Sequence, residues 1–116
     1  MIWRNSDGAL RFFKDQVPVY QTENFKKNYI IKGGGALVLG QEQDGLSSGF
    51  DASQSLRGSL ASVNVWDHLL SPGQLESNCF SCRDVEAGNV YKWSDFRDAI
   101  RGNGVLVIPS PCSPSE

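Results

Sequence analysis

The sequence lacks the features that mark membrane-spanning and nucleic-acid-binding proteins. No apolar run approaches the roughly 18 residues of a membrane-spanning helix. The 11 basic and 13 acidic side chains give a net charge of -2. The one basic cluster, Lys26, Lys27 and Lys32, is typical of a solvated edge, and nucleic-acid binding needs far more positive charge on one face. We therefore expect neither nucleic acid as a partner nor a membrane span.

Cysteine and histidine are also scarce. The chain has 3 cysteines, Cys79, Cys82 and Cys112, and 1 histidine, His68. Two cysteines can pair and leave the third for another chain, or all three can be reduced. The Cys79–Cys82 pair lacks the further ligands of a zinc site. It also does not open a helix after a buried strand, as a thioredoxin-type redox pair does, so neither kind of site is expected.

The sequence also shows no arrangement of residues that catalysis requires. A Ser-His-Asp site would need His68, which stands in a turn-like segment where a lone histidine is usually a surface residue. Glu42 and Asp44 lie two residues apart in one segment. They would therefore face the same side of a substrate rather than flank it, as the two carboxylates of a glycosidase do. The sequence predicts no enzyme.

Glycine and short apolar stretches are what the chain has instead. Its 116 residues, 40% hydrophobic and including 12 glycines, are enough for one domain. The stretches bounded by turn residues predict strands over residues 8–14, 17–20, 29–31, 36–39, 56–66, 89–93 and 105–108. Asp15 and Gln16 would form a hairpin turn, and Pro18 indicates an edge strand. The pattern predicts an all-β fold, either an antiparallel sandwich or a barrel.

One short helix is expected among the strands. Ser71 can accept from the free amides of a first turn, Pro72 suits the first helical position, and Gln74 completes a capping box. The helix would end near Asn78. Residues 109–116 are rich in proline and serine, which is typical of a tail or linker.

A polar, acidic loop over residues 40–54 carries the candidate site. Its oxygen-bearing side chains are Glu42, Gln43, Asp44, Asp51 and Gln54. Calcium prefers roughly six to eight hard oxygen ligands, and the glycines of the loop would let its two arms fold back toward one ion. The spacing is not that of an EF-hand. The loop predicts a calcium site, with a solvated acidic turn as the alternative.

The sequence resembles the pentraxin family over roughly residues 3 to 108. Four blocks follow in the family's order: LGQEQD at 39–44, GFDASQSL at 49–56, VNVWD at 63–67 with LSP at 70–72, and NVYKW at 89–93. The resemblance implies a lectin-like antiparallel jelly-roll sandwich whose calcium ions, on one face, hold a phosphocholine-like or anionic glycan group.

The same resemblance implies a role for each residue of the loop. Glu42, Asp44, Asp51 and Gln54 would supply side-chain oxygens, and Gln43 its backbone carbonyl. A glutamate would be expected where Asp51 stands, so the shorter side chain would weaken that ligand or admit a water.

The resemblance covers only the second half of a pentraxin domain, so residues 1–108 would be a domain incomplete at its N-terminus. The absent half would supply further calcium ligands, and a homo-oligomer or a partner chain would complete the sandwich. The cysteines resemble those of pentraxin modules in larger extracellular proteins, where Cys112 would bond to Cys79 or Cys82.

The expected function is therefore that of a calcium-dependent extracellular module that binds a ligand in pattern recognition. The alternative is a structural or adhesion module of a mosaic extracellular protein without functional calcium binding. Calcium affinity separates the two.

Overall fold

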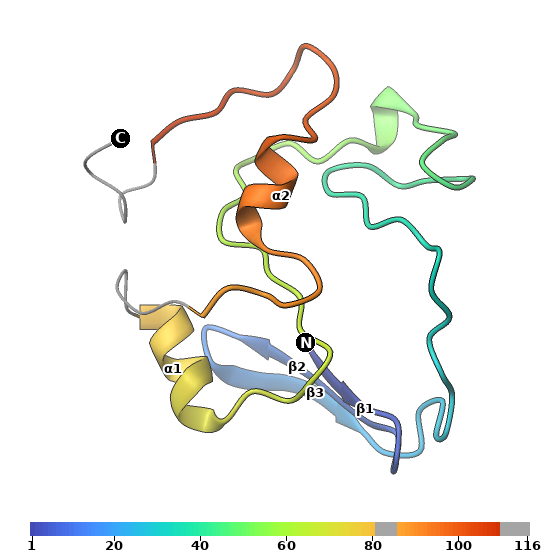
Figure 1. The fold of residues 1–116 in the computed structure, drawn as a ribbon, viewed down its shortest axis with the longest axis vertical. Helices are drawn as coiled ribbons and strands as arrows, with labels where there is room; N and C mark the ends of the chain where they lie inside the picture. Colours follow the sequence, from blue (N-terminus) through green and yellow to red (C-terminus); the bar gives the residue numbers. More distant parts are fainter. Residues whose placement is uncertain (81–85, 110–116) are drawn as a thin grey trace.

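The computed structural model describes residues 1–80 and 86–109. Its elements are β1 (Ile2–Arg4), β2 (Ala9–Lys14), β3 (Val17–Thr22), the 3₁₀ turn η1 (Ala52–Gln54), α1 (Pro72–Phe80) and α2 (Trp93–Arg97). Figure 1 shows the three strands together in one sheet and long irregular segments between the later elements. The radius of gyration, 16.0 Å, exceeds the about 13 Å expected of a compact domain of this length.

The three strands form one antiparallel sheet in the order β1-β2-β3. Asp15 and Gln16 connect β2 to β3 with φ values of 50° and 66°. Two positive φ values are what a two-residue type I′ hairpin requires. The predicted hairpin is confirmed, and so is the edge position of Pro18, which lies in β3.

The N-terminal turn is fixed by an ion pair and by the segment that follows β3. The Arg4 guanidinium holds the pKa of Asp7 well below its ordinary range, and the amide of Ala9 adds to this by donating to the same carboxylate over 3.1 Å. The Phe25 amide donates to the Gly8 carbonyl over 2.9 Å. Trp3 Nε1 donates to the Phe25 carbonyl over 3.0 Å. These contacts hold the chain beyond β3 against the sheet.

One face of the sheet is apolar. Leu10 and Phe12 alternate onto it from β2, and Trp3 pairs with Leu10 across β1. Tyr20 pairs with Phe12, and their rings make an edge contact with centroids 5.9 Å apart. Only Ala9 and Leu10 are buried apolar residues in the part of the chain that the structure describes.

Five predicted strands are wrong. The segments 29–31, 36–39, 56–66, 89–93 and 105–108 form no strand: they are irregular apart from one isolated bridge between Val65 and Tyr91, and Trp93 begins α2. A strand is stable only when a neighbour satisfies its backbone and covers its apolar face, and within the described ranges these segments have no such neighbour. Ile30 and Leu106 are accordingly 74% and 84% exposed.

The structure contains the predicted helix, α1, and also a second helix, α2, that was not predicted. The Ser71 hydroxyl accepts from the Gln74 amide over 3.2 Å, and Gln74 Oε1 accepts from the Ser71 amide over 2.8 Å. This confirms the capping box, and α1 begins at Pro72 as expected. Helix α2 replaces the end of a predicted strand because Asp95 accepts from the Lys92 amide over 3.0 Å.

The remaining predictions concern the disulfides and the C-terminal tail. Cys79 lies in α1, whereas Cys82, Cys112 and residues 110–116 of the predicted tail fall outside the described residues. The predicted disulfides therefore fall there too. In residues 1–80 and 86–109 no helix is long and apolar enough to cross a membrane.

Candidate functional site

The loop with the candidate ligands is closed at its base. The Leu56 amide donates to the Gly40 carbonyl over 2.8 Å, so the two ends of the loop meet. A compact surface loop with adjoining ends is a common carrier of function. The closure places both arms of the predicted site, residues 42–44 and 51–54, on one unit.

The Gln43 side chain fixes the first arm. Its Nε2 donates to the Ala36 carbonyl over 2.8 Å, and its Oε1 accepts from the Ser47 amide over 2.9 Å. Gly45 and Ser48 exchange two backbone hydrogen bonds of 3.3 and 3.2 Å across the tip. Because the Gln43 side chain is occupied, its backbone carbonyl is the group that can turn toward a cation.

Asp51 organises the second arm. Its Oδ1 accepts from the Ser53 hydroxyl over 2.7 Å and from the Ser53 amide over 2.8 Å. These two donors lower the pKa of Asp51 below its ordinary value, the hydroxyl having the larger effect. The Asp51 carbonyl accepts from the Gln54 amide over 3.0 Å, which closes η1. The carboxylate stays ionised, and Oδ2 takes part in neither bond.

Gly49 brings the two arms close together. A Cβ placed on Gly49 would lie 2.6 Å from the Asp44 Cβ and 3.1 Å from the Asp44 amide nitrogen. The φ of Gly49 is +74°, a conformation that favours glycine. Only glycine therefore fits this crossing, two residues before Asp51.

The structure does not gather the predicted carboxylates into a finished cluster. Glu42, Asp44 and Asp51 are all exposed. Within the described residues, no three or more side chains of His, Cys, Asp or Glu lie close enough together to hold a metal ion. The donors themselves are all oxygen and suit calcium.

Two residues of the loop were not foreseen. Ser53 acts as the donor that orients Asp51, and the spacing Asp-x-Ser is a known signal for such a cap. Gln41 has a buried Oε1 that accepts no hydrogen bond from the described residues. No sequence pattern would have indicated that unpaired oxygen.

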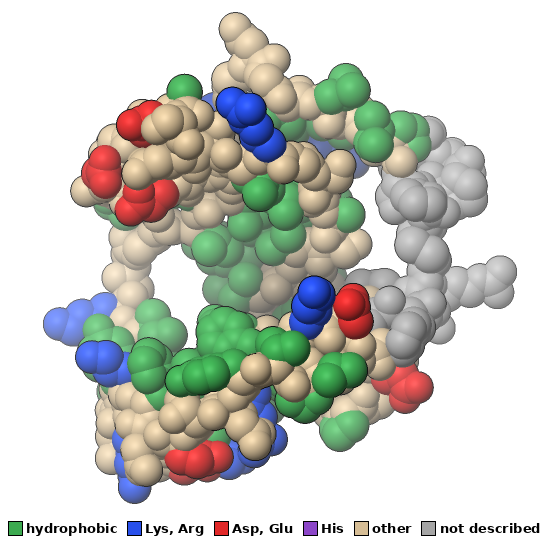
Figure 2. All heavy atoms as spheres, turned by 180° about the vertical axis from the view of Figure 1, so that it is seen from behind, with side chains coloured by type: hydrophobic (Ala, Val, Ile, Leu, Met, Phe, Trp, Pro, Cys, Tyr) green, Lys and Arg blue, Asp and Glu red, His purple; other side chains and the backbone are tan. Residues whose placement is uncertain are grey.

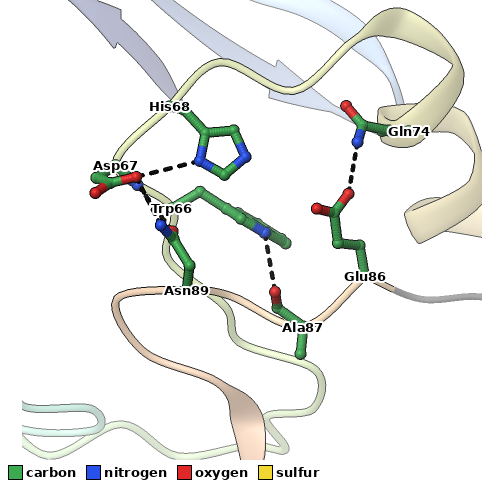
Figure 3. A network of polar contacts seen from close by, with 7 residues as sticks. All are labelled: Trp66, Asp67, His68, Gln74, Glu86, Ala87 and Asn89. Carbon is green, nitrogen blue, oxygen red and sulfur yellow. Dashed lines mark hydrogen bonds and ion pairs between the residues drawn. The ribbon is translucent and has the colours of Figure 1, made fainter.

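A second polar network joins two of the sequence blocks that resemble the family (Figure 3). Asn89 Nδ2 donates to Asp67 Oδ1 over 2.7 Å, and the Asp67 amide donates to Asn89 Oδ1 over 3.1 Å. The Asn89 amide, followed by the neighbouring His68 ring, lowers the pKa of Asp67. Trp66 Nε1 donates to the Ala87 carbonyl over 3.2 Å. This network lies outside the acidic loop, and it links the segment of Trp66 and Asp67 to the segment of Ala87 and Asn89.

Comparison with known proteins defines first the class and then the family. The class is that of its relatives, which are extracellular ligand-binding modules. The sequence pattern described as "Pentaxin family" matches residues 1–109. The chain is 41% identical over 101 residues to "Sushi, von Willebrand factor type A, EGF and pentraxin domain-containing protein 1" of Rattus norvegicus. It is 38% identical over 100 residues to "Neuronal pentraxin-1" of Homo sapiens and 35% over 107 residues to "C-reactive protein" of Rattus norvegicus. This chain belongs to the Pentaxin family.

These relatives are longer than the chain. The matches cover 86%, 86% and 92% of this chain but only 3%, 23% and 45% of the respective relatives. The family implies a jelly-roll β-sandwich, of which the described residues form a three-stranded antiparallel sheet. Members of the family are not enzymes, so the prediction of no enzyme is confirmed.

Proposed function

We propose that this chain is part of a calcium-dependent extracellular module that binds a ligand, and that its calcium site lies in the loop closed between Gly40 and Leu56. The observation that carries the proposal is the arrangement of oxygen donors on that one loop. Each arm is held by hydrogen bonds through one side chain, Gln43 in the first arm and Asp51 in the second, and membership of the Pentaxin family adds support.

The donors divide into fixed and movable ones. The Gln43 carbonyl and Asp51 Oδ2 belong to residues whose side chains are held by Ser47 and Ser53. Glu42 and Asp44 are exposed, so their carboxylates can swing toward an ion with little loss of packing. Calcium, when bound, would supply the positive charge that offsets the repulsion between these carboxylates.

The second arm completes the donor set. The Gln54 amide oxygen follows Asp51 through η1 and would approach from the same arm. Because aspartate is shorter than glutamate, a water between Asp51 and the ion is part of the proposal. The loop then holds calcium with oxygen donors only.

The bound ligand would be an anionic or phosphocholine-like group that meets the ion from solvent. This follows from charge, because a cation at an exposed loop leaves coordination positions open to oxygen anions. The proposal has three further parts. The module is extracellular, and Cys112 forms a disulfide. Residues 1–108 are a partial domain and residues 109–116 are its tail.

A second candidate function is a structural or adhesion module without calcium binding. The observation in its favour is that the carboxylates are separated in the described residues. In that case the hydrogen bonds of the loop would maintain its shape alone.

Calcium titration of the full chain distinguishes the two. We expect heat of binding and a rise in melting temperature with calcium relative to chelator, since saturation at about 100 times Kd stabilises by about 2.7 kcal/mol. Asp44→Asn should abolish both. Glu76→Gln, which removes an exposed carboxylate of α1 outside the loop, is the matched control and should keep both. No calcium response in the unmodified chain would favour the structural module.

A further inference from the structure

The segment 101–104, with the sequence Arg-Gly-Asn-Gly, contains the only Asn-Gly pair of the chain. Its four residues are all exposed. A Cβ placed on Gly102 or on Gly104 would meet no atom within 4 Å. In Figure 1 the chain that follows α2 crosses the end of the molecule opposite the sheet, and Figure 2 shows a hollow between these two parts. The segment therefore stands in solvent, with open space around both glycines.

An asparagine followed by glycine can react with its own backbone. The Gly104 amide nitrogen attacks Cγ of Asn103, a new C–N bond forms, and the bond from Cγ to Nδ2 breaks. Nδ2 leaves as ammonia with the proton that the Gly104 amide gives up. Water then opens the succinimide ring at one of its two carbonyls, which leaves aspartate or isoaspartate. Glycine permits the closure because no Cβ hinders its nitrogen, and an intramolecular attack is fast when the reacting atoms can meet in the required geometry.

Other asparagines have side chains that are held in place. The Nδ2 of Asn64 donates to the Ser62 carbonyl over 3.0 Å, and its Oδ1 accepts from the Gly88 amide over 3.0 Å. The Asn89 amide group is bound on both sides by Asp67. Both asparagines also precede valine, whose branched side chain hinders the attacking nitrogen. Their side chains cannot turn toward the following amide without losing these bonds.

Elsewhere it is the attacking amide that is held. The amides that follow Asn24 and Asn28 donate to the Gly8 carbonyl over 2.9 Å and to the Lys26 carbonyl over 3.0 Å. An amide that donates to a carbonyl is directed away from the side chain before it. By contrast, no hydrogen bond joins Asn103 or Gly104 to another residue of the ranges 1–80 and 86–109.

The two Asp-Gly pairs, which are open to the same ring closure, are held as well. The Asp7 carboxylate is bound by Arg4 and by the Ala9 amide. The Gly45 amide, which follows Asp44, donates to the Ser48 carbonyl over 3.3 Å. The pair at 103–104 thus differs from both, because the described residues engage neither its side chain nor its amide.

We propose that Asn103 is a site of spontaneous deamidation, with the Gly104 amide nitrogen as the attacking group and water as the second reactant. The reaction replaces a neutral amide by a carboxylate two residues after Arg101. The aspartyl product makes residues 101–103 an exposed Arg-Gly-Asp segment, with a cation and an anion on either side of Gly102. The site is separate from the calcium loop, residues 40–56, and its reaction needs no metal.

Timed incubation of the full chain in a calcium chelator, at several pH values, tests the proposal. Mass spectrometry of proteolytic peptides identifies each converted asparagine. Asn103 should convert while Asn64 and Asn89 stay intact, and the rate should rise with pH because the attacking nitrogen must lose its proton. Chromatography should resolve an aspartyl and an isoaspartyl product, since the ring opens at either carbonyl. The chelator keeps the result independent of the proposed calcium site.

Two glycines with open surroundings give a matched pair of variants. Gly104→Val hinders the attacking nitrogen and should slow conversion of Asn103 by at least about tenfold. Gly35→Val, also at a position with no atom within 4 Å, should leave the rate unchanged. A single aspartyl product, or equal rates in the two variants, would show that the ring does not form. Conversion of Asn103 about tenfold slower in the folded chain than in urea would also overturn the proposal, because the fold would then protect the site.

Discussion

The region up to Tyr29 and the region from Ile30 to the start of α1 have similar apolar content and very different order. The first forms three paired strands and a segment held back against them. The second contains one 3₁₀ turn and one closed loop. The two regions differ in whether their extended segments have a strand nearby in the sequence with which to pair. In the first, each strand pairs with its neighbour in sequence.

The comparison distinguishes segments whose pairing partners are close in the sequence from segments whose partners are far away in the sequence. Hairpin pairing costs little loop entropy because the paired residues are close in the chain. Segments such as 36–39 have the composition of a buried strand but no adjacent strand to pair with. The calcium loop is intermediate, because side-chain bonds from Gln43 and Asp51 shape it without a sheet.

The largest loss of stability is expected from a substitution at Gly8, in the region of paired strands. A Cβ placed there would lie 2.6 Å from the Asn24 carbonyl carbon and from the Phe25 amide nitrogen, and φ is +67°. The backbone cannot yield as a flexible side chain would, so Gly8→Ala should destabilise the sheet by about 2 kcal/mol. Hydrogen exchange of the β2 amides measures this. Gly33→Ala, which meets no atom within 4 Å, should change nothing, and equal exchange rates in both variants would contradict the account.

A smaller and more confined effect is expected at Gly49. Gly49→Ala would force the two arms of the loop apart, because its Cβ would collide with the Asp44 side chain and amide. If the loop binds calcium, we expect about a tenfold loss of affinity, equivalent to about 1.4 kcal/mol, with unchanged exchange in the sheet. Calcium titration measures the loss. Gly104→Ala, which meets no atom within 4 Å, is the control, and an unaltered affinity in Gly49→Ala would argue against the proposed site.

Sequence reasoning succeeded where the determining contacts are local. The hairpin at Asp15 and Gln16 and the cap of Ser71 with Gln74 each depend on residues at most three positions apart, and both are confirmed. The predicted strand over 105–108 failed because periodicity reports the capacity to be a strand and not the presence of a partner. For the candidate site, sequence indicated the donors but not the orienting bond from Ser53 to Asp51.

The cap of α1 gives a prediction of about 1 kcal/mol. Ser71→Ala removes the hydroxyl that accepts from the Gln74 amide, and loss of such a cap costs about 1 kcal/mol of helix stability. Faster hydrogen exchange in the first turn of α1 would register it. Ser77→Ala, at an exposed position within the same helix, should leave exchange unchanged or slower, because alanine favours helix. Acceleration in both variants would mean that the hydroxyl at position 71 has no special role.

The smallest expected effect is a change in the titration of Asp51. The Ser53 hydroxyl is the main cause of the lowered pKa of Asp51, so Ser53→Ala should raise that pKa toward the ordinary value of about 3.9. A carboxylate with a depressed folded pKa contributes stability that is fully present above its unfolded pKa and is lost as pH falls through the folded one. In Ser53→Ala the folded pKa of Asp51 lies closer to the unfolded one, so this contribution to stability should be smaller and should be lost over a narrower pH range. NMR titration of the Asp51 carboxyl carbon would record the raised pKa. Ser55→Ala is the matched control, because its hydroxyl donates to the Ala52 carbonyl and not to Asp51. A pKa that rises equally in both variants would assign the shift to the closed loop as a whole.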